Sequence, residues 1–492
     1  NNLRVKIVVS RYNSHMHDPK GRQRDLAKRT LTYATMTISV IVLVAVSLFL
    51  VLGYSVDRDG QPEQGGLVQF RSFPTGASVH IDGAKQNFTT NNKKNTSPGY
   101  HNVAMDLKGY RGWSKNFDLG RGELLWLNAL LIPKQITTES AQSFDQLAGT
   151  KVSPDKNWIA VVENPSQAKL KIIDIRDEKK PKVTELAIPV ITAKPEPGDV
   201  FRVVEWDVGS RYILVTHTSG KKTEWLSLDR SDAANTRNIS VLKNIAISDA
   251  HFVGDSGNLM YIMTDGAVRK IDISDSRQVP KDVAKNVKEF ALYRDDRIGY
   301  VANTPEGQVV SFYDETEDQT AKVRGFQSTQ KNVHTAISNY FNEDYQAISR
   351  GTMVEVIKDP LGLRKSFAKF ELTSGVKWLY FSASGRFVVA QNGSSLSVYD
   401  LERLQNFVFN IPDNPPYRLT SHLKWLDDYH LVSDAGGMLT IFEYDGTNIE
   451  TIGSISEGFD ISLSSNGKRL FYIDKNSKTK KPALQSSVMV IE

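Results

Sequence analysis

The sequence predicts one membrane-spanning helix near the N-terminus followed by a large all-β region. Three observations lead to this fold class. Residues 30–56 contain no charged side chain, residues 67–133 alternate apolar and polar positions between turn signals, and a turn-and-strand phrase recurs from residue 149 onward. An uncharged apolar run of this length favours a membrane span, whereas alternation favours half-buried strands.

The uncharged run is long enough to cross a bilayer as a helix. About 20 residues, each rising 1.5 Å, span a hydrocarbon core about 30 Å thick. Tyr33 and Tyr54 lie near the two ends of the run, where aromatic rings favour the membrane interface. A buried core helix rarely runs so long without a charge, and a cleaved signal peptide has a shorter apolar region and a small-residue cleavage site. We therefore predict a transmembrane helix over residues 30–56.

The charges that flank this run predict its orientation. Residues 1–29 hold eight Lys and Arg residues against Asp18 and Asp25. Basic residues are retained on the cytoplasmic side, so residues 1–29 are predicted to form a cytoplasmic tail, and the body is expected to be extracellular or periplasmic. The tail accounts for the formal net charge of +5, because residues 30–492 hold 53 basic and 54 acidic residues. We expect no nucleic-acid partner for such a body.

The chain contains no Cys, which excludes disulfides, thiolate nucleophiles and zinc–thiolate sites. Residues 57–66 are polar and rich in Gly and Pro, and they predict a linker next to the membrane.

Residues 67–133 show the signals of a small all-β domain. An alternating strand comes first, followed by a turn, a second strand that ends in an Asp-Gly hairpin signal, and a closing apolar strand at residues 124–132. The residues that mark these turns are Pro74, Gly76, Ala77, Asp82, Gly83, Gly109 and Tyr110.

The order of these elements is S-x-P-x-G-A, V-x-I-D-G, G-x-H-x-V and K-G-Y. It resembles the PEGA domain, a small β-sandwich of bacterial and archaeal surface proteins. Thr75 stands where the Pro-Glu-Gly-Ala turn of that family has Glu. The resemblance implies a surface-associated, non-catalytic module over residues 67–133, and it names no ligand.

The rest of the chain repeats a polar turn followed by an apolar strand. Eight copies lie about 39–55 residues apart, a period typical of propeller blades with four short strands each. The copies are at residues 153–161, 209–215, 255–261, 294–300, 342–348, 383–389, 426–432 and 465–471. The turn residues singled out as repeat positions are Asp155, Gly209, Gly257, Gly385 and Gly467.

These phrases resemble TolB-like and WD-like propeller repeats, in which S-P-D-G precedes the second strand. We predict a β-propeller over residues 134–492, with eight blades as the leading count and seven as the alternative. The last copy ends in a third strand at residues 488–492 without a fourth. Residues 135–148 are expected to supply that strand and so to close the ring.

The sequence offers little catalytic chemistry. G-x-S-x-G, H-E-x-x-H, the P-loop and G-x-G-x-x-G are all missing. The nine His residues do not pair at metal-ligand spacing, and His422 and His430 are interpreted as ordinary surface or inter-blade side chains. We therefore predict no enzyme activity, no cofactor and no metal.

Two sets of acidic residues are also given structural interpretations. Asp174, Asp272 and Asp400 recur at equivalent turn positions, where Asp accepts hydrogen bonds from the backbone. The acidic loop comprises Asp314, Glu315, Glu317 and Asp318, without the spacing of an EF-hand.

Recurring aromatic residues predict packing between blades. They are Trp206, Phe252, Phe381 and Trp425, each shortly before a repeat turn. Trp126 lies in the closing strand of the small domain and is expected to pack on neighbouring strands or on the propeller.

The leading hypothesis is a bacterial cell-surface binding or scaffold protein, and the layout resembles membrane-anchored PEGA proteins. The expected partner is a protein or a cell-envelope component, with residues 331–334 and 412–417 as candidate contacts. Two alternatives stay open: a propeller enzyme with carboxylates in its central channel, and a subunit of a membrane-embedded secretion, pilus or envelope-assembly complex.

Overall fold

A computed structural model describes residues 19–51, 53–56, 61–189, 198–275, 277–294, 296–327, 332–411 and 422–491. The described residues divide into two compact units. One unit holds the residues up to Val103 together with Asn116–Leu127, and the other holds Ala104–Lys115 together with the residues from Asn128 onward. Candidate contact residues 331 and 412–417, and most of the basic tail, lie outside the described residues.

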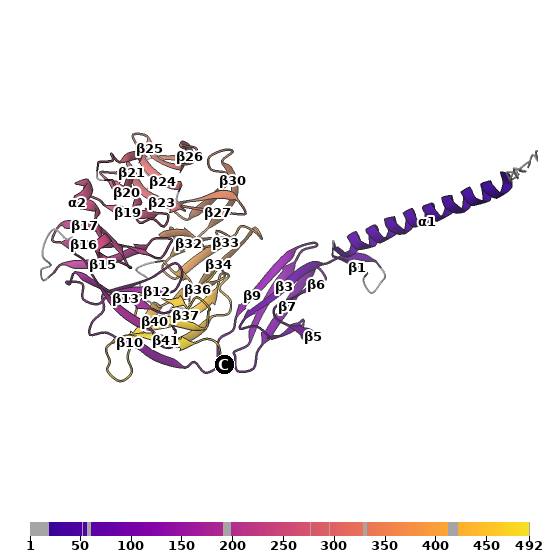
Figure 1. The fold of residues 1–492 in the computed structure, drawn as a ribbon, viewed down its shortest axis with the longest axis horizontal. Helices are drawn as coiled ribbons and strands as arrows, with labels where there is room; N and C mark the ends of the chain where they lie inside the picture. The colour runs from indigo at the N-terminus through magenta and orange to yellow at the C-terminus, as the bar shows by residue number, and fades with distance from the viewer. Residues whose placement is uncertain are drawn as a thin grey trace, which may run out of the picture. The chain divides into compact units, whose positions relative to one another are not determined.

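Helix α1, Pro19–Val51, contains the apolar run (Figure 1). An 18-residue window within Gln23–Phe49 has a mean hydropathy of 2.1 and is not buried, and α1 is the one helix in the described residues long and apolar enough to cross a membrane. Thr32, Thr35, Thr37 and Ser39 each donate a hydroxyl proton to the carbonyl four residues earlier, at 2.8–2.9 Å. Their polar groups are therefore satisfied within the helix, as an apolar environment requires.

The helix and the predicted span differ at both ends. In the described residues the helix extends upstream of Thr30 as far as Pro19, because the residues between them are largely good helix formers. It ends at Val51, close to Gly53, whose φ of +77° is a left-handed conformation that commonly terminates helices. Strand β1, Tyr54–Val56, then pairs with β2, Pro62–Gln64, so the end of the expected span and part of the expected linker form a small hairpin.

The small domain consists of two sheets. One has the order β6-β3-β9, with β3 Gly66–Phe73, β6 Asn92–Thr96 and β9 Leu124–Leu130. The other has the order β5-β4-β7-β8, with β4 Ser78–Ile81, β5 Ala84–Thr89, β7 Gly99–Asp106 and β8 Trp113–Leu119. Alternate residues of β8 are buried, so one face of the strand packs in the core. The buried core includes Val68, Phe70, Val79, Val103, Met105, Trp113, Phe117, Leu119, Leu125 and Leu127.

Eight four-stranded antiparallel sheets follow in the described residues (Figure 1). The first two are β11 Gly149–Val152, β12 Trp158–Val162, β13 Lys169–Asp174 and β14 Lys182–Ala187, then β15 Val200–Trp206, β16 Tyr212–Ser219, β17 Lys222–Asp229 and β18 Arg237–Asn238. The next two are β19 Asp249–Val253, β20 Leu259–Thr264, β21 Ala267–Asp272 and β22 Lys281–Ala284, then β23 Val287–Tyr293, β24 Arg297–Thr304, β25 Gly307–Asp314 and β26 Gln319–Gln327.

The last four sheets continue the same pattern. They are β27 Val333–Tyr340, β28 Glu343–Arg350, β29 Met353–Lys358 and β30 Lys365–Glu371, then β31 Trp378–Phe381, β32 Phe387–Asn392, β33 Ser395–Asp400 and β34 Gln405–Asn410. After them come β35 Lys424–Trp425, β36 His430–Ser433, β37 Met438–Glu443 and β38 Glu450–Ser454, then β39 Ser462–Leu463, β40 Arg469–Lys475 and β41 Pro482–Val488. Short helices are η1 Ala233–Asn235, α2 Ile239–Lys243 and η2 Ala435–Gly437.

Strand β10, Thr138–Ser143, completes the last sheet. It pairs antiparallel with β41, from Thr138 opposite Ser487 to Ser143 opposite Ala483. This pairing confirms the expectation that residues 135–148 supply the missing strand, and it covers an edge that would otherwise be exposed. The third strand itself ends at Val488, so it lies before the predicted residues 488–492. The chain thus folds as a propeller, and the number of blades stays a prediction.

The hydrophobic core of the propeller lies between neighbouring sheets. Trp206 of β15 packs in one cluster with Ile172 of β13, and Phe252 of β19 packs with Leu214 of β16. These contacts confirm that the recurring aromatic residues join adjacent sheets.

The remaining two recurring aromatics follow the same rule. Phe381 of β31 packs against the cluster that contains Ala347 of β28. Trp425 of β35 stacks on Phe387 of β32, with 5.7 Å between the ring centroids.

Candidate functional site

Local hydrogen bonds fix the conformation of the Pro-x-Gly-Ala turn. The Thr90 hydroxyl accepts hydrogen bonds from the backbone N–H groups of Gly76 at 3.1 Å and Ala77 at 3.0 Å. Gly76 has φ +90°, and Ala77 is fully buried. Pro74 precedes them, and its carbonyl accepts a hydrogen bond from Ser72 Oγ at 2.6 Å. These residues shape the turn, and they present no reactive group.

The Asp-Gly pair organises the following hairpin. Asp82 and Gly83 have φ of +50° and +78°, the left-handed conformation that hairpin turns require. Asp82 Oδ1 accepts a hydrogen bond from Asn102 N at 2.9 Å, and Oδ2 contacts His101 Nδ1 at 2.7 Å. The Asn102 backbone, followed by the His101 ring, lowers the pKa of Asp82 below its usual value.

Gly109 and Tyr110 tie the turn between β7 and β8 to neighbouring backbone. The Gly109 carbonyl accepts a hydrogen bond from Lys134 N at 2.9 Å, at a residue whose φ is +91°. The Tyr110 hydroxyl accepts a hydrogen bond from Ile491 N at 2.7 Å. Both contacts lie within the second compact unit.

Two of the repeat-turn glycines lie close against the preceding sheet. A Cβ atom at Gly257 would lie 2.2 Å from the Tyr212 ring, and one at Gly385 would lie 2.3 Å from the carbonyl oxygen of Asn339. Both have positive φ, +66° and +78°. The turn therefore requires Gly for two reasons, conformation and space.

The other repeat-turn residues also have structural contacts. Asp155 donates its backbone N–H to Ser210 Oγ at 3.1 Å, which links two adjacent sheets. A Cβ atom at Gly209 would lie 2.9 Å from Asp255 Cβ. Gly467, with φ +73°, donates its N–H to the carbonyl of Ser464 at 2.8 Å.

The repeated aspartates are turn residues, as predicted. Asp174, Asp272 and Asp400 each accept a hydrogen bond from the backbone N–H two residues later, at 3.1, 2.8 and 2.9 Å. Together they form no group of carboxylates around a shared space in the described part of the chain.

The acidic loop at residues 314–318 is engaged by basic residues and hydroxyls. Glu315 Oε2 accepts hydrogen bonds from Lys270 Nζ at 2.6 Å and from the Tyr261 hydroxyl at 2.5 Å. Asp318 Oδ1 accepts from Lys281 Nζ at 2.9 Å. Across the described ranges, no group of three or more His, Asp or Glu residues is placed to hold a metal ion.

Two glutamates, each on the first strand of one propeller sheet, contact the first strand of the sheet that follows. Glu205 follows a register shift in β15, and its Oε1 accepts a hydrogen bond from Phe252 N at 2.6 Å while its Oε2 contacts His251 Nδ1 at 2.9 Å. A β-bulge redirects side chains, which explains how a strand residue reaches the neighbouring sheet. Sequence alternation alone does not locate such a shift.

Glu289 repeats this arrangement in a different pair of sheets. It follows a register shift in β23, its Oε2 contacts His334 Nδ1 at 2.8 Å, and its Oε1 accepts from Thr335 N at 3.1 Å. His334 belongs to the candidate contact range 331–334, and here its ring is part of an inter-sheet joint.

A cavity of about 820 Å³ lies beside β16, β17 and α2. It arises where the fourth strand of the sheet, β18, has only two residues and leaves part of β17 uncovered. His217 lines the cavity and is 1 % exposed, its Nε2 lies 3.1 Å from Asp199 Oδ2, and its ring stacks on Phe201 at 4.3 Å. This acid–imidazole pair is the feature most like a catalytic group among the cavities described.

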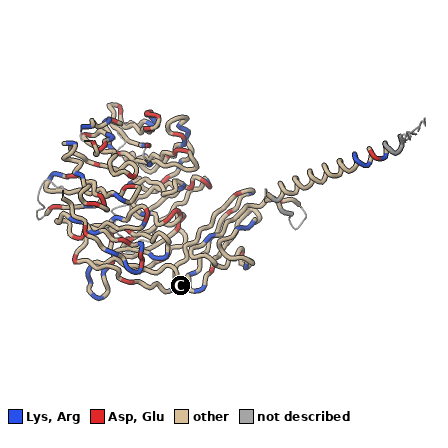
Figure 2. Tube along the Cα trace, in the orientation of Figure 1, with Lys and Arg blue, Asp and Glu red and all other residues tan. Residues whose placement is uncertain are grey.

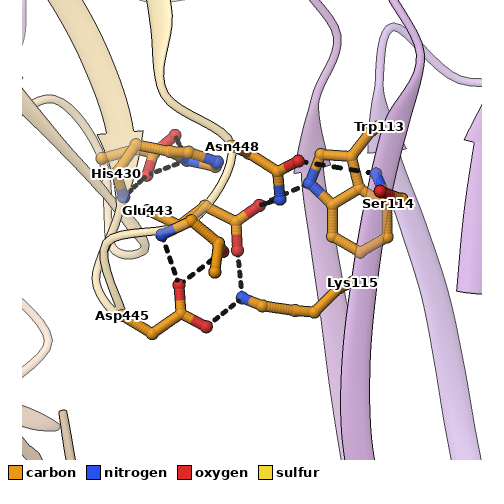
Figure 3. A network of polar contacts seen from close by, with 9 residues as sticks. Trp113, Ser114, Lys115, His430, Glu443, Asp445 and Asn448 are labelled. Carbon is orange, nitrogen blue, oxygen red and sulfur yellow. Dashed lines mark hydrogen bonds and ion pairs between the residues drawn. The ribbon is translucent and has the colours of Figure 1, made fainter. Parts of the chain in front are cut away.

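A buried charge cluster centres on Lys115 and Glu443 (Figure 3). Lys115 is on β8, and its Nζ forms ion pairs with Glu443 Oε2 and, at 2.9 Å, with Asp445 Oδ2. The three side chains are 7 %, 3 % and 10 % exposed. Trp113 Nε1 and Asn448 Nδ2 both donate to Glu443 Oε1. We call these five residues the Lys115 cluster.

Electrostatics in the Lys115 cluster favour the charged forms. Burial alone would lower the pKa of Lys115, but Glu443 and then Tyr444 and Asp445 outweigh it, so the pKa is well above its usual value. Burial would raise the pKa of Asp445, but Lys115 holds it below the usual value.

The segment that carries Lys115 makes a second ion pair with the same region of the propeller. Arg111 Nη1 lies 2.5 Å from Glu450 Oε2 and donates to the Thr451 carbonyl at 3.0 Å. Sequence reasoning did not select Lys115, although the buried alternation of β8 places it on the apolar face between Trp113 and Phe117. Lys on that face is the signal that could have identified it, because buried Lys requires a charged partner.

Comparisons with known proteins bear on the two domains separately. Residues 66–135 match the family model of the PEGA domain. No curated protein matches the chain.

Solved structures similar to the chain include one described as a propeller and two further proteins. The Dos1 propeller has a TM-score of 0.44 and 11 % identity, covering 72 % of this chain and 95 % of that one. Hsv2 of Kluyveromyces lactis has a TM-score of 0.36 and 12 % identity, covering 69 % and 97 %. The dihydro-heme d1 dehydrogenase NirN, in complex with DHE, has a TM-score of 0.42 and 11 % identity, covering 63 % and 67 %.

Proposed function

We propose that this chain is a single-pass membrane protein that carries a non-catalytic β-propeller scaffold on the outer face of a bacterial membrane. The observation that carries the membrane part is the long, unburied segment Gln23–Phe49 of α1, which has no charged residue from Thr30 onward. The eight basic residues in residues 1–29 support a cytoplasmic N-terminus. The PEGA match supports a body outside the cytoplasm.

The proposal of a scaffold role rests on the partners of the buried charged residues. Lys115 and Glu443 hold the segment Ala104–Lys115 against the β35–β38 sheet, within one compact unit. Glu205 and Glu289 hold neighbouring first strands together. Carboxylates with such partners make the body rigid. They favour a body that presents a fixed surface to a protein or cell-envelope partner, and they disfavour an enzyme that uses free carboxylates in its central channel.

The membrane proposal is tested by fractionation and protease accessibility of the full chain with a C-terminal tag. We expect the chain to stay in the membrane after carbonate extraction, with an intact N-terminal region and a tag that external protease removes. A body released in soluble form with a new N-terminus after α1 would contradict a membrane anchor and identify a cleaved signal sequence. Protection of the tag in intact cells would contradict the orientation.

The scaffold proposal is tested by cross-linking in the native membrane followed by purification in mild detergent. We expect a defined partner that is captured by the wild-type chain. A Lys115→Met variant loosens one attachment of the propeller, and we expect it to capture less of the same partner. Purification of the chain as a monomer without any cross-linked partner would contradict the scaffold role.

A further inference from the structure

The hairpin between β40 and β41 concentrates positive charge on a body that is nearly neutral overall. Lys475, Lys478 and Lys480 lie within six residues and are exposed. In the described part of the chain none of the three forms an ion pair, whereas the adjacent Lys481 pairs with Asp145 at 2.7 Å. Figure 2 shows this hairpin, which follows β40 in Figure 1, as a blue loop.

These three lysines line a cavity of about 770 Å³. The cavity lies between the outer strand β38 and the closing sheet of β10, β40 and β41. Its walls are otherwise polar to a large extent, with Thr138, Ser140, Ser454, Tyr472, Asn476, Ser477 and Gln485 among the lining residues. Its size is that of a site for a small organic ligand.

One carboxylate faces this cavity, and it has a local partner. Asp474 Oδ2 accepts a hydrogen bond from Ser454 Oγ at 2.5 Å. Gln485 and Ser140 are likewise joined, at 3.0 Å. The three ammonium groups therefore exceed the acidic charge in the wall, while hydroxyl and amide groups remain close to them.

We propose that this cavity binds a phosphorylated ligand that carries more than one negative charge. Ammonium groups bind phosphate as point charges, each with three donors, and several of them around one cavity favour an anion with several charges. Both a soluble phosphorylated compound and a lipid phosphate headgroup have this chemistry.

The test uses the full chain in nanodiscs of zwitterionic lipid, with inorganic pyrophosphate as the probe and calorimetry as the readout. The variant K475Q/K478Q/K480Q removes the three charges. The matched control K85Q/K93Q/K108Q removes three exposed lysines of the small domain. We expect pyrophosphate affinity to fall about tenfold or more in the first variant. The control is expected to bind like the wild type, and higher salt is expected to weaken binding.

Equal pyrophosphate affinities in the two variants, or no binding by the wild type, would overturn the proposal. The melting temperature without ligand is measured for both variants, because exposed Lys→Gln changes are expected to leave it unchanged. A second arm measures association of the same nanodiscs with vesicles that contain phosphatidic acid, a lipid whose phosphate monoester carries more than one negative charge. Vesicle association lost only in K475Q/K478Q/K480Q assigns the site to a lipid headgroup, and pyrophosphate binding without vesicle association assigns it to a soluble ligand.

Discussion

Glu205 on β15 and His251 on β19 join two adjacent sheets of the propeller across a distance of 2.9 Å. Burial alone would lower the pKa of His251, but hydrogen bonds with Asp249 and Glu205 outweigh it and raise the pKa to about 10. The protonated imidazole is therefore the folded form over most of the physiological range. The same carboxylate also accepts the Phe252 N–H, so one side chain fixes both ring and backbone of the next strand.

The first prediction concerns the pH dependence of this joint. Because the folded pKa exceeds the unfolded value of about 6.5, the contribution to stability is complete below that pH and is lost as pH rises through about 10. The melting temperature should fall between pH 7 and 10.5 by more in the wild type than in His251→Gln. Parallel curves for the two proteins would show that the ion pair contributes no pH dependence.

The contact between these two sheets can also be removed by replacing Glu205. Glu205→Ala leaves the Phe252 N–H without its acceptor, and we expect a loss of about 1–3 kcal/mol in the free energy of unfolding. Glu306→Ala is the matched control, because that glutamate is exposed in a turn. A loss no larger in Glu205→Ala than in the control, measured by urea denaturation, would contradict the structural role.

The second prediction concerns Lys115. Lys115→Met leaves Glu443 and Asp445 buried without their cation, and loss of one partner of a buried pair costs about 3–5 kcal/mol. The double variant Lys115→Met with Glu443→Gln removes one uncompensated charge and should be less destabilised than Lys115→Met alone. Urea denaturation measures both. A double variant that is more destabilised than Lys115→Met alone would contradict the ion pair.

Lys108→Met is the matched control for the Lys115 experiment, because it removes an exposed lysine of the same segment. Hydrogen exchange adds a local readout. In Lys115→Met the amides of residues 104–115 should exchange faster, while those of β16 should be unchanged. Uniform acceleration over the propeller would indicate general destabilisation instead of a loosened segment.

The fold was predictable wherever the pattern is local. Alternation in β8 and the Asp82–Gly83 turn follow from neighbouring residues, and the missing fourth strand follows from counting strands in the last repeat. The Lys115–Glu443 pair joins residues 328 apart, and no local pattern indicates which distant residue meets a buried lysine. The inter-sheet role of Glu205 depends on a register shift, and alternation cannot locate one.

The cavity lined by Lys475, Lys478 and Lys480 could not be predicted from the sequence for a different reason. The total charge of residues 30–492 is close to zero, which correctly describes the body as a whole but hides the local excess at Lys475, Lys478 and Lys480. Other basic groups of the propeller have acidic neighbours, such as Lys270 with Glu315. The distinction between paired and unpaired lysines depends on tertiary contacts, which composition does not contain.

The third prediction concerns Gly257. Gly257→Ala places a Cβ 2.2 Å from the Tyr212 ring at a φ of +66°, so both overpacking and backbone strain contribute, about 2–4 kcal/mol together. Gly266→Ala is the matched control, since its φ is +69° and nothing lies within 4 Å of the added Cβ. It should cost about 1 kcal/mol. Equal losses in urea denaturation would show that the approach of Tyr212 is unimportant.

The last prediction is a substitution that should raise the free energy of unfolding. Leu404 is 62 % exposed and has φ +55°, a conformation that costs a non-glycine residue about 1–2 kcal/mol and that Asn adopts more readily. Leu404→Asn removes little buried apolar surface, so we expect the urea midpoint to rise by the equivalent of about 0.5–1 kcal/mol with an unchanged slope. Val279→Asn is the control, because Val279 is 82 % exposed and is not among the residues with positive φ. It should leave the midpoint unchanged or lower it. A midpoint that falls in Leu404→Asn would mean that the leucine side chain stabilises this turn by contacts that outweigh its backbone strain.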